Sequence, residues 1–186
     1  MLDEKIKKGG LMKKSFTFLF MSLIVCTFCF AQSMQEPAVD GIYLMGTETI
    51  KFIPPQGWKT IDFDHDTILN FSPENIDSSA FLGFVFLTGG YDIIFSSRKE
   101  IDVLKDMVET MKRQPGYLTV EIINFNGFEA IKSTSSNLHG KDMQIQFFKN
   151  NKQIVVTFSA GKEEFAQLLP LVEKSFETLE FISSTK

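Results

Sequence analysis

The residues best suited to chemistry are three aspartates at alternating positions, Asp62, Asp64 and Asp66. Carboxylates with this spacing can converge on Ca²⁺, and the stretch resembles the start of a calcium-binding loop. However, Thr67 stands where such a loop needs glycine, and Pro73 stands where it needs a bidentate glutamate. In a strand, alternating residues simply share one face. We therefore predict an acidic hairpin turn, with these aspartates as incomplete calcium ligands, and we expect no other cofactor.

Nucleophilic catalysis has little support in the sequence. The only two histidines are His65 and His139, and a serine, histidine and aspartate arrangement would need Ser135 or Ser159 as the nucleophile. No G-x-S-x-G elbow is present to expose either hydroxyl group. His139 precedes Gly140, which is typical of a surface turn. We predict that the chain is not an enzyme.

The N-terminus predicts export. Two lysines precede an apolar run from Phe16 to Ala31, and polar residues follow the run. Such a run is short for a membrane span and fits a signal peptide over residues 1–31, cleaved after Ala31. Acidic residues near the first methionine favour Met12 as the true start. The alternative is a retained leader, which would be the chain's only contact with a membrane.

Both cysteines, Cys26 and Cys29, lie inside this leader. The exported chain would therefore have no disulfide, no thiolate nucleophile and no cysteine metal site. Large residues precede both cysteines, which disfavours a lipid anchor. The formal net charge is −4, and loss of the lysine-rich leader would make it more negative. This charge excludes non-specific binding to nucleic acid or to anionic membranes.

The order of patterns predicts an antiparallel sheet with two helices. After a flexible lead-in over 32–41, we expect strands over 42–45, 49–53, 59–63, 67–71, 81–87, 91–95, 118–125, 128–135, 141–148, 153–159 and 180–182. Ser97 begins a capping box that opens an amphipathic helix, and a second helix spans 162–179 with a kink or break at Pro170. The continuous apolar run over 81–87 predicts a strand covered on both faces. The fold class is α+β, an α/β/α sandwich, in a single domain over 42–183.

Two short stretches act as structural landmarks. Pro54 and Pro55 cannot continue a central strand, and Gly57 relaxes the backbone before Trp58, the only tryptophan. We expect this turn to place the side chain of Trp58 in the core. Asn126 and Gly127 give the strongest hairpin signal in the chain.

These landmarks resemble the PsbP-like (DcrB-like) proteins. The resemblance rests on the exported leader, the stretch from Phe52 to Trp58, the hairpin from Asn124 to Ala130 and the closing segment from Phe165 to Phe181. It implies an antiparallel sheet flanked by helices. It also implies a non-catalytic interaction module.

The sequence therefore predicts a non-catalytic exported protein, periplasmic or secreted, that binds an unknown protein or envelope partner. A different hypothesis follows from the 20 phenylalanines. A Phe-lined pocket between sheet and helix would make the protein a binder of a small apolar ligand or lipid. An apolar cavity would favour the second hypothesis, and an exposed apolar face would favour the first.

Overall fold

The computed structural model describes residues 41–45, 48–64, 67–75, 77–88, 95 and 97–182, with the backbone alone for 62–64 and 88. The predicted leader, the start at Met12 and the cut after Ala31 lie outside these residues, as do most of the predicted strand over 91–95. The described residues belong to one compact unit. Its elements are β1 (Ile42–Met45), β2 (Glu48–Lys51), β3 (Trp58–Asp64), β4 (Ile68–Pro73), β5 (Phe81–Thr88), α2 (Glu100–Lys112), β6 (Tyr117–Phe125), β7 (Phe128–Ser136), β8 (Lys141–Lys149), β9 (Lys152–Ala160), α3 (Lys162–Phe176) and β10 (Glu180–Ile182).

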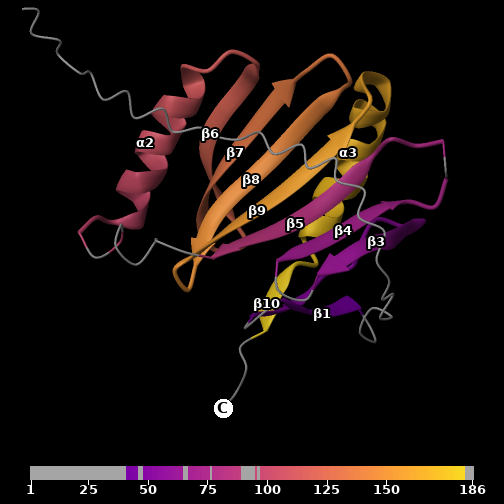
Figure 1. Ribbon diagram of the computed structural model, residues 1–186, viewed down its shortest axis with the longest axis horizontal. Helices are drawn as coiled ribbons and strands as arrows, with labels where there is room; N and C mark the ends of the chain where they lie inside the picture. The colour runs from indigo at the N-terminus through magenta and orange to yellow at the C-terminus, as the bar shows by residue number, and fades with distance from the viewer. Residues whose placement is uncertain are drawn as a thin grey trace, which may run out of the picture. The chain divides into compact units, whose positions relative to one another are not determined.

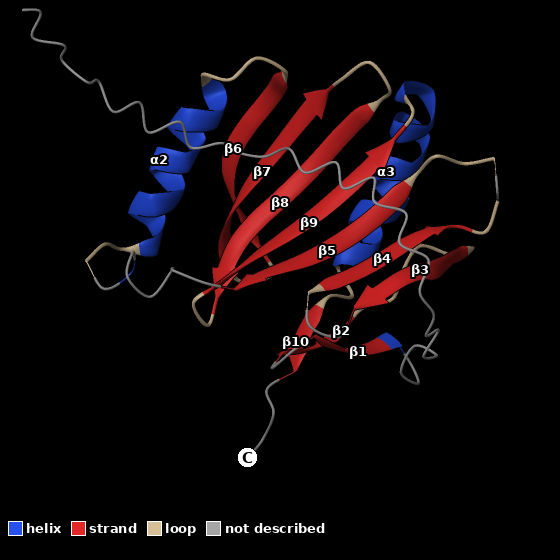
Figure 2. Cartoon of the chain, viewed as in Figure 1, coloured by secondary structure: helices blue, strands red, loops and turns tan. Residues whose placement is uncertain are grey.

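Seven strands form one antiparallel sheet in the order β3-β4-β5-β9-β8-β7-β6, shown as red arrows in Figure 2. The chain completes one meander, β3 to β5, and a second, β6 to β9. The second meander returns so that β9 pairs with β5 along its full length. The predicted α+β class with an antiparallel sheet and two helices is confirmed.

Alternation along the strands assigns the two helices to opposite faces of this sheet. Phe147 packs in the core cluster that includes α3, whereas its neighbour Phe148 packs in the cluster that includes α2. Consecutive strand residues point to opposite faces. Figure 1 shows α2 beside β6 and β7, with α3 behind the sheet. The arrangement is the predicted sandwich.

The α3 face carries the main core, which is dense in aromatic side chains. Phe165 of α3 stacks on Phe158 with ring centroids 5.0 Å apart. Phe176 meets Phe125 edge to face at 5.5 Å. Both distances fall within the range of favourable ring pairs. This side of the sheet is a closed aromatic core.

A second sheet, which the sequence did not predict as separate, extends this core. It has the order β1-β2-β10, so the last strand pairs with one of the first. Its inner face contributes the buried residues Tyr43, Met45 and Ile50 to the main core cluster. Its outer face exposes Leu44 and Ile182. The small sheet therefore covers one end of the core with a single apolar face.

The structure differs from the predicted cap of the first helix and from the predicted break and end of the second. The α2 helix begins at Glu100 with Lys99 at the N-cap and no side-chain capping bond, so Ser97 does not open a capping box. The α3 helix is one continuous element with Pro170 inside it, so the predicted break is absent, while a kink at Pro170 stays a prediction. Helix α3 also ends at Phe176, because Leu179 already belongs to the turn that leads into β10.

The strand over Phe81–Thr88 corrects another prediction. Leu82, Phe84 and Phe86 are buried against the main core. On the other face, Phe81 and Leu87 are 36% and 42% exposed. The continuous apolar run therefore marks one buried face and one open apolar face.

Candidate functional site

The structure describes the side chains of only some of the residues that the sequence predicts to be important. The side chains of Asp62, Asp64 and Asp66 lie outside the described part of the structure, so the calcium candidates stay a prediction. Among the side chains that are described, no three histidine, cysteine or acidic residues gather closely enough to hold a metal ion. The proline and asparagine landmarks are described, and both are structural.

The corner at Pro54 and Pro55 sets Trp58 into the core. The amide of Trp58 donates to the carbonyl of Pro55 at 3.0 Å, which closes a tight turn through Gly57. Gly57 has a φ of +77°, a conformation that glycine adopts without strain. Trp58 is 8% exposed and its ring lies 6.4 Å from that of Phe158. The prediction that Trp58 is a core anchor is confirmed.

Asn126 does more than form a hairpin turn. It has a φ of +49° and precedes Gly127 at +88°, as the turn between β6 and β7 requires. Its side-chain amide also donates to the carbonyls of Phe176 at 2.9 Å and Leu179 at 3.2 Å. The Phe176 carbonyl lies at the C-terminal end of α3, where helical partners are missing, and Leu179 lies in the turn that follows. The side chain therefore ties the hairpin to the helix.

The serine and aspartate cluster near His139 is a structural network. Asp142 accepts hydrogen bonds from Ser135 at 3.4 Å, from Asn137 at 3.1 Å and from Ser159. The backbone amide of His139 donates to the Asn137 side chain at 2.8 Å, which fixes the turn. Among the described residues, both serines bond directly to the carboxylate and no imidazole bond to either is present. The cluster lacks the nucleophile–base contact of a catalytic triad.

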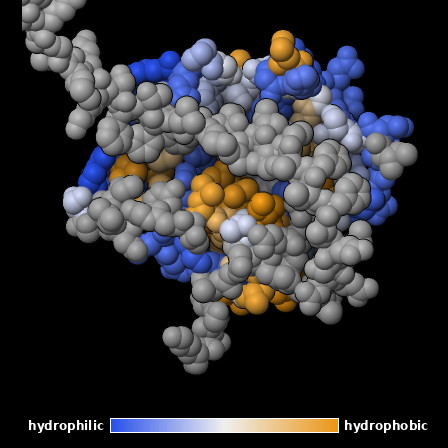
Figure 3. All heavy atoms as spheres, viewed as in Figure 1, coloured by the Kyte–Doolittle hydropathy of each residue, from blue (hydrophilic) through white to orange (hydrophobic). Residues whose placement is uncertain are grey.

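The sheet face on the α2 side is divided into a covered and an open half. Over the covered half, four buried residues of α2 pack on Ile131 and Phe148. The open half lies over β4, β5 and β9, and no described element covers it. The strand register aligns Val85 with Ile68 and Val155 across this half. Figure 3 shows hydrophobic side chains gathered in its middle.

A column of glutamines separates the two halves. Gln153 donates to Gln146 at 3.1 Å, and Gln146 donates to Gln144 at 3.2 Å. Cross-strand register places Gln146 beside Val155 and Gln153 beside Leu87. Bonding among these side chains satisfies polar groups that would otherwise be costly to bury. The open apolar strip, Ile68, Phe81, Val85, Leu87 and Val155, thus has a polar border.

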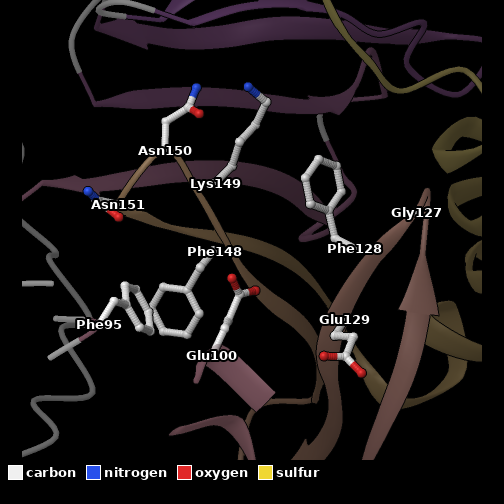
Figure 4. Close-up of a pocket in the computed structure, with 9 residues that line it drawn as sticks. All are labelled: Phe95, Glu100, Gly127, Phe128, Glu129, Phe148, Lys149, Asn150 and Asn151. Carbon is white, nitrogen blue, oxygen red and sulfur yellow. The ribbon is translucent and has the colours of Figure 1, made fainter. Parts of the chain in front are cut away.

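A groove lies next to this strip, where α2 begins and the turn between β8 and β9 projects. Its volume is about 600 Å³. Three phenylalanines, Phe95, Phe128 and Phe148, form its apolar walls, and Asn150 and Asn151 of the turn close one end (Figure 4). It is open and partly polar, so it differs from the enclosed apolar pocket between sheet and helix that a lipid binder would need.

Lys149, which lines the groove, already has an acidic partner. Lys149 bonds Glu48 at 2.8 Å, and Asn150 donates to the same carboxylate at 2.6 Å. Burial would raise the pKa of Glu48, but bonds from Lys149 and Asn150 and the positive charge of Lys149 and Lys152 outweigh it and lower the pKa. This ion pair joins β2 to the large sheet.

Glu100 and Glu129 also line the groove, and Figure 4 shows Glu100 between Phe148 and Glu129. Burial, together with the negative charge of Glu129, raises the pKa of Glu100. Neither carboxylate has an ion pair or hydrogen bond within the described residues. No sequence motif pointed to these residues, because α2, β7 and the turn between β8 and β9 supply them separately.

Neither helix in the described part of the chain has the length and apolar character of a membrane span. No protein-family model and no curated protein sequence matches the chain.

Several solved structures are similar to it. Cyanobacterial PsbP from Synechocystis sp. PCC 6803 is 13% identical with a TM-score of 0.47, over 84% of this chain and 99% of that one. LpqN, described as involved in cell envelope biogenesis of Mycobacterium tuberculosis, is 13% identical with a TM-score of 0.47, over 74% of this chain and 86% of that one. PA94 of Pseudomonas aeruginosa, a protein of unknown function, is 14% identical with a TM-score of 0.41, over 68% of this chain and 99% of that one. At these values the similarity concerns the fold and transfers no ligand, partner or activity. The solved structures to which this chain is similar thus include a PsbP protein, the kind of protein that the sequence itself resembles.

Proposed function

We propose that the protein is a non-catalytic exported accessory protein that binds a partner protein through the open half of the α2-side sheet face. The observation that carries this proposal is the apolar strip over β4, β5 and β9. Phe81 and Leu87 of the strip are 36% and 42% exposed. Val85 lies between them on the same face, and the register aligns it with Ile68 and Val155. Contiguous exposed apolar side chains with a polar border are typical of protein interaction sites.

The same observation favours the interaction hypothesis over the apolar-ligand hypothesis. Phe158 and Phe165 fill the space between the sheet and α3, and both are at most 5% exposed. The groove beside α2 contains two glutamates and a lysine, which an apolar ligand would have to desolvate at considerable cost. A protein partner instead needs an accessible surface, and the strip provides one.

Affinity capture from the native envelope fraction tests the proposal with a matched pair of variants. Leu87→Asp places a charge in the strip, whereas Leu171→Asp places the same charge on an exposed position of α3. We expect wild type and Leu171→Asp to retain the same stoichiometric partner, and Leu87→Asp to lose it. Equal recovery of the partner by both variants would show that the strip is not the binding surface. Failure of all three proteins to recover any stoichiometric partner would refute the interaction function.

Export is the second part of the proposal. The leader predicted over residues 1–31 would deliver the chain across the membrane, with translation starting at Met12 and cleavage after Ala31. Mass spectrometry of the native protein should find a chain that begins at Gln32. An N-terminal peptide containing Leu2 or Asp3 would contradict both the start and the cleavage.

A further inference from the structure

We propose that the groove at the start of α2 binds a protonated amine or guanidinium group carried on an apolar chain. This site is distinct from the apolar strip proposed above as the partner surface. The charges of the groove, its aromatic walls and its volume all favour such a ligand.

The groove holds uncompensated negative charge. Glu100 and Glu129 approach closely enough for one charge to disfavour the other. Lys149, which lines the groove, is already bound to Glu48 at 2.8 Å, and its ammonium lies 5.3 Å from the ring of Phe181. Arg98, just before α2, is bound to Asp106 at 2.8 Å. A cationic ligand would therefore relieve a repulsion that the described residues leave in place.

Aromatic rings line the same groove as these carboxylates. Phe95 and Phe148 meet edge to face with centroids 4.9 Å apart, and Phe128 stacks on Phe147 at 5.1 Å. In Figure 4, Glu100 lies between the Phe95 and Phe148 pair and Glu129. Ring faces attract cations, and ring edges pack against methylene groups. Carboxylates beside aromatic walls suit a ligand with a charged head and an apolar stem.

Other ligand classes fit less well. An anion would meet the two carboxylates, and a neutral apolar ligand would desolvate them without compensation. Ca²⁺ takes six to eight oxygen ligands, which phenylalanine walls do not supply. The volume of about 600 Å³ lies within the range of small-molecule clefts and exceeds what a bare ion occupies. An organic cation is the ligand class that can pair with the carboxylates and also pack against the phenylalanine rings.

The test is an NMR titration of the purified full-length protein with pentylammonium, using pentanol and pentanoate as neutral and anionic controls of the same length. We expect pentylammonium to shift the backbone amides of Glu100, Glu129 and Asn150 saturably. Pentanol and pentanoate should bind at least about tenfold more weakly, because each lacks a charge-assisted bond. No saturable shift with pentylammonium, or an equal response to pentanol, would overturn the proposal.

Matched variants assign the effect to the groove. Glu100→Gln and Glu129→Gln should each weaken pentylammonium binding about tenfold. Glu109→Gln removes the same charge from the same helix, about 13 Å along its axis, and should leave binding unchanged. An equal loss with Glu109→Gln would show attraction to net charge alone and would contradict a built site. Circular dichroism spectra confirm that each variant is folded.

A second probe distinguishes the source of the cation. An acetylated Gly-Lys-Gly amide that shifts the same residues would identify a side chain of another protein as a fitting ligand. Binding of pentylammonium without the peptide would identify a free small amine. These titrations contain no partner protein, so their outcome is independent of the capture experiment on Leu87 and Leu171.

Discussion

The two faces of the seven-stranded sheet use the same strands for different purposes. On the α3 face, aromatic residues such as Phe158 and Phe165 are stacked and excluded from water. On the α2 face, glutamines bond one another and Leu87 remains 42% exposed. Because consecutive strand residues alternate between the faces, stability and binding can be tested by substituting neighbours in one strand. We infer that the α3 face supplies most of the stability and leaves the α2 face available for recognition.

The largest effect is expected at the corner that anchors the α3-side core. Trp58→Ala removes an indole that is 8% exposed and in contact range of Phe158. We expect a loss of about 4 kcal/mol in the free energy of unfolding, measured by urea denaturation. A loss well under about 1 kcal/mol would mean that the indole is not a core group, and the corner would then become a candidate partner site.

Two neighbours in β9 give the sharpest comparison of the faces. Ile154 is 0% exposed on the α3 side, whereas Val155 is half-buried on the α2 side. Ile154→Ala should cost about 3 kcal/mol, and Val155→Ala about 1 kcal/mol, in the same urea experiment. Comparable losses would show that both faces are equally packed, which would contradict the proposal that the α3 face supplies most of the stability.

The ion pair between Glu48 and Lys149 should give the next effect. Because the pKa of Glu48 is lowered by its partners despite burial, its contribution is present above the ordinary carboxyl pKa and is lost as the pH falls through the lowered value. We expect Glu48→Gln to cost about 2 kcal/mol near neutral pH and less in acid.

Glu180→Gln is the control for Glu48, because Glu180 belongs to the same small sheet and forms an exposed pair with Lys51. It should change stability by less than about 0.5 kcal/mol at any pH. A pH dependence in Glu48→Gln equal to that of wild type would argue against the buried carboxylate as its cause.

The smallest effect concerns the groove. The pKa of Glu100 is raised by burial and by Glu129, so ionising this group weakens the folded state. Its favourable contribution is present in acid and declines as the pH rises through the carboxyl range. Relative to wild type, Glu100→Gln should gain a few tenths of a kcal/mol between about pH 4 and about pH 7 in thermal unfolding. A relative loss over that interval would show that Glu100 has a compensating partner.

Local patterns were enough to predict most elements. The alternation of Met143, Ile145 and Phe147 with polar residues correctly predicted a strand with a buried face. Its second face was expected to be wet, but Gln146 and Phe148 are buried there as well. The Asn126–Gly127 pair correctly predicted the turn between β6 and β7. These signals lie within a few residues of the structure that they specify, which is why they can be read without a fold.

Features that depend on distant contacts could not be predicted. Glu48 and Lys149 are far apart in sequence, and their bond exists only because β2 lies against the β8 end of the large sheet. The apolar run from Phe81 to Leu87 gave no indication that one of its faces is open, since composition does not report which elements cover a strand. The groove is harder still, because Glu100 and Glu129 become neighbours only after α2 packs on the sheet.

Photo-crosslinking in the producing cell tests the central claim most directly. A benzoylphenylalanine placed at Leu87 samples the α2-side strip, and one placed at Leu171 samples the outer surface of α3. These positions are similarly accessible, at 42% and 49% exposure. We expect a discrete crosslinked product from Leu87 and none from Leu171. A product from Leu171 alone, or from neither position, would contradict that claim.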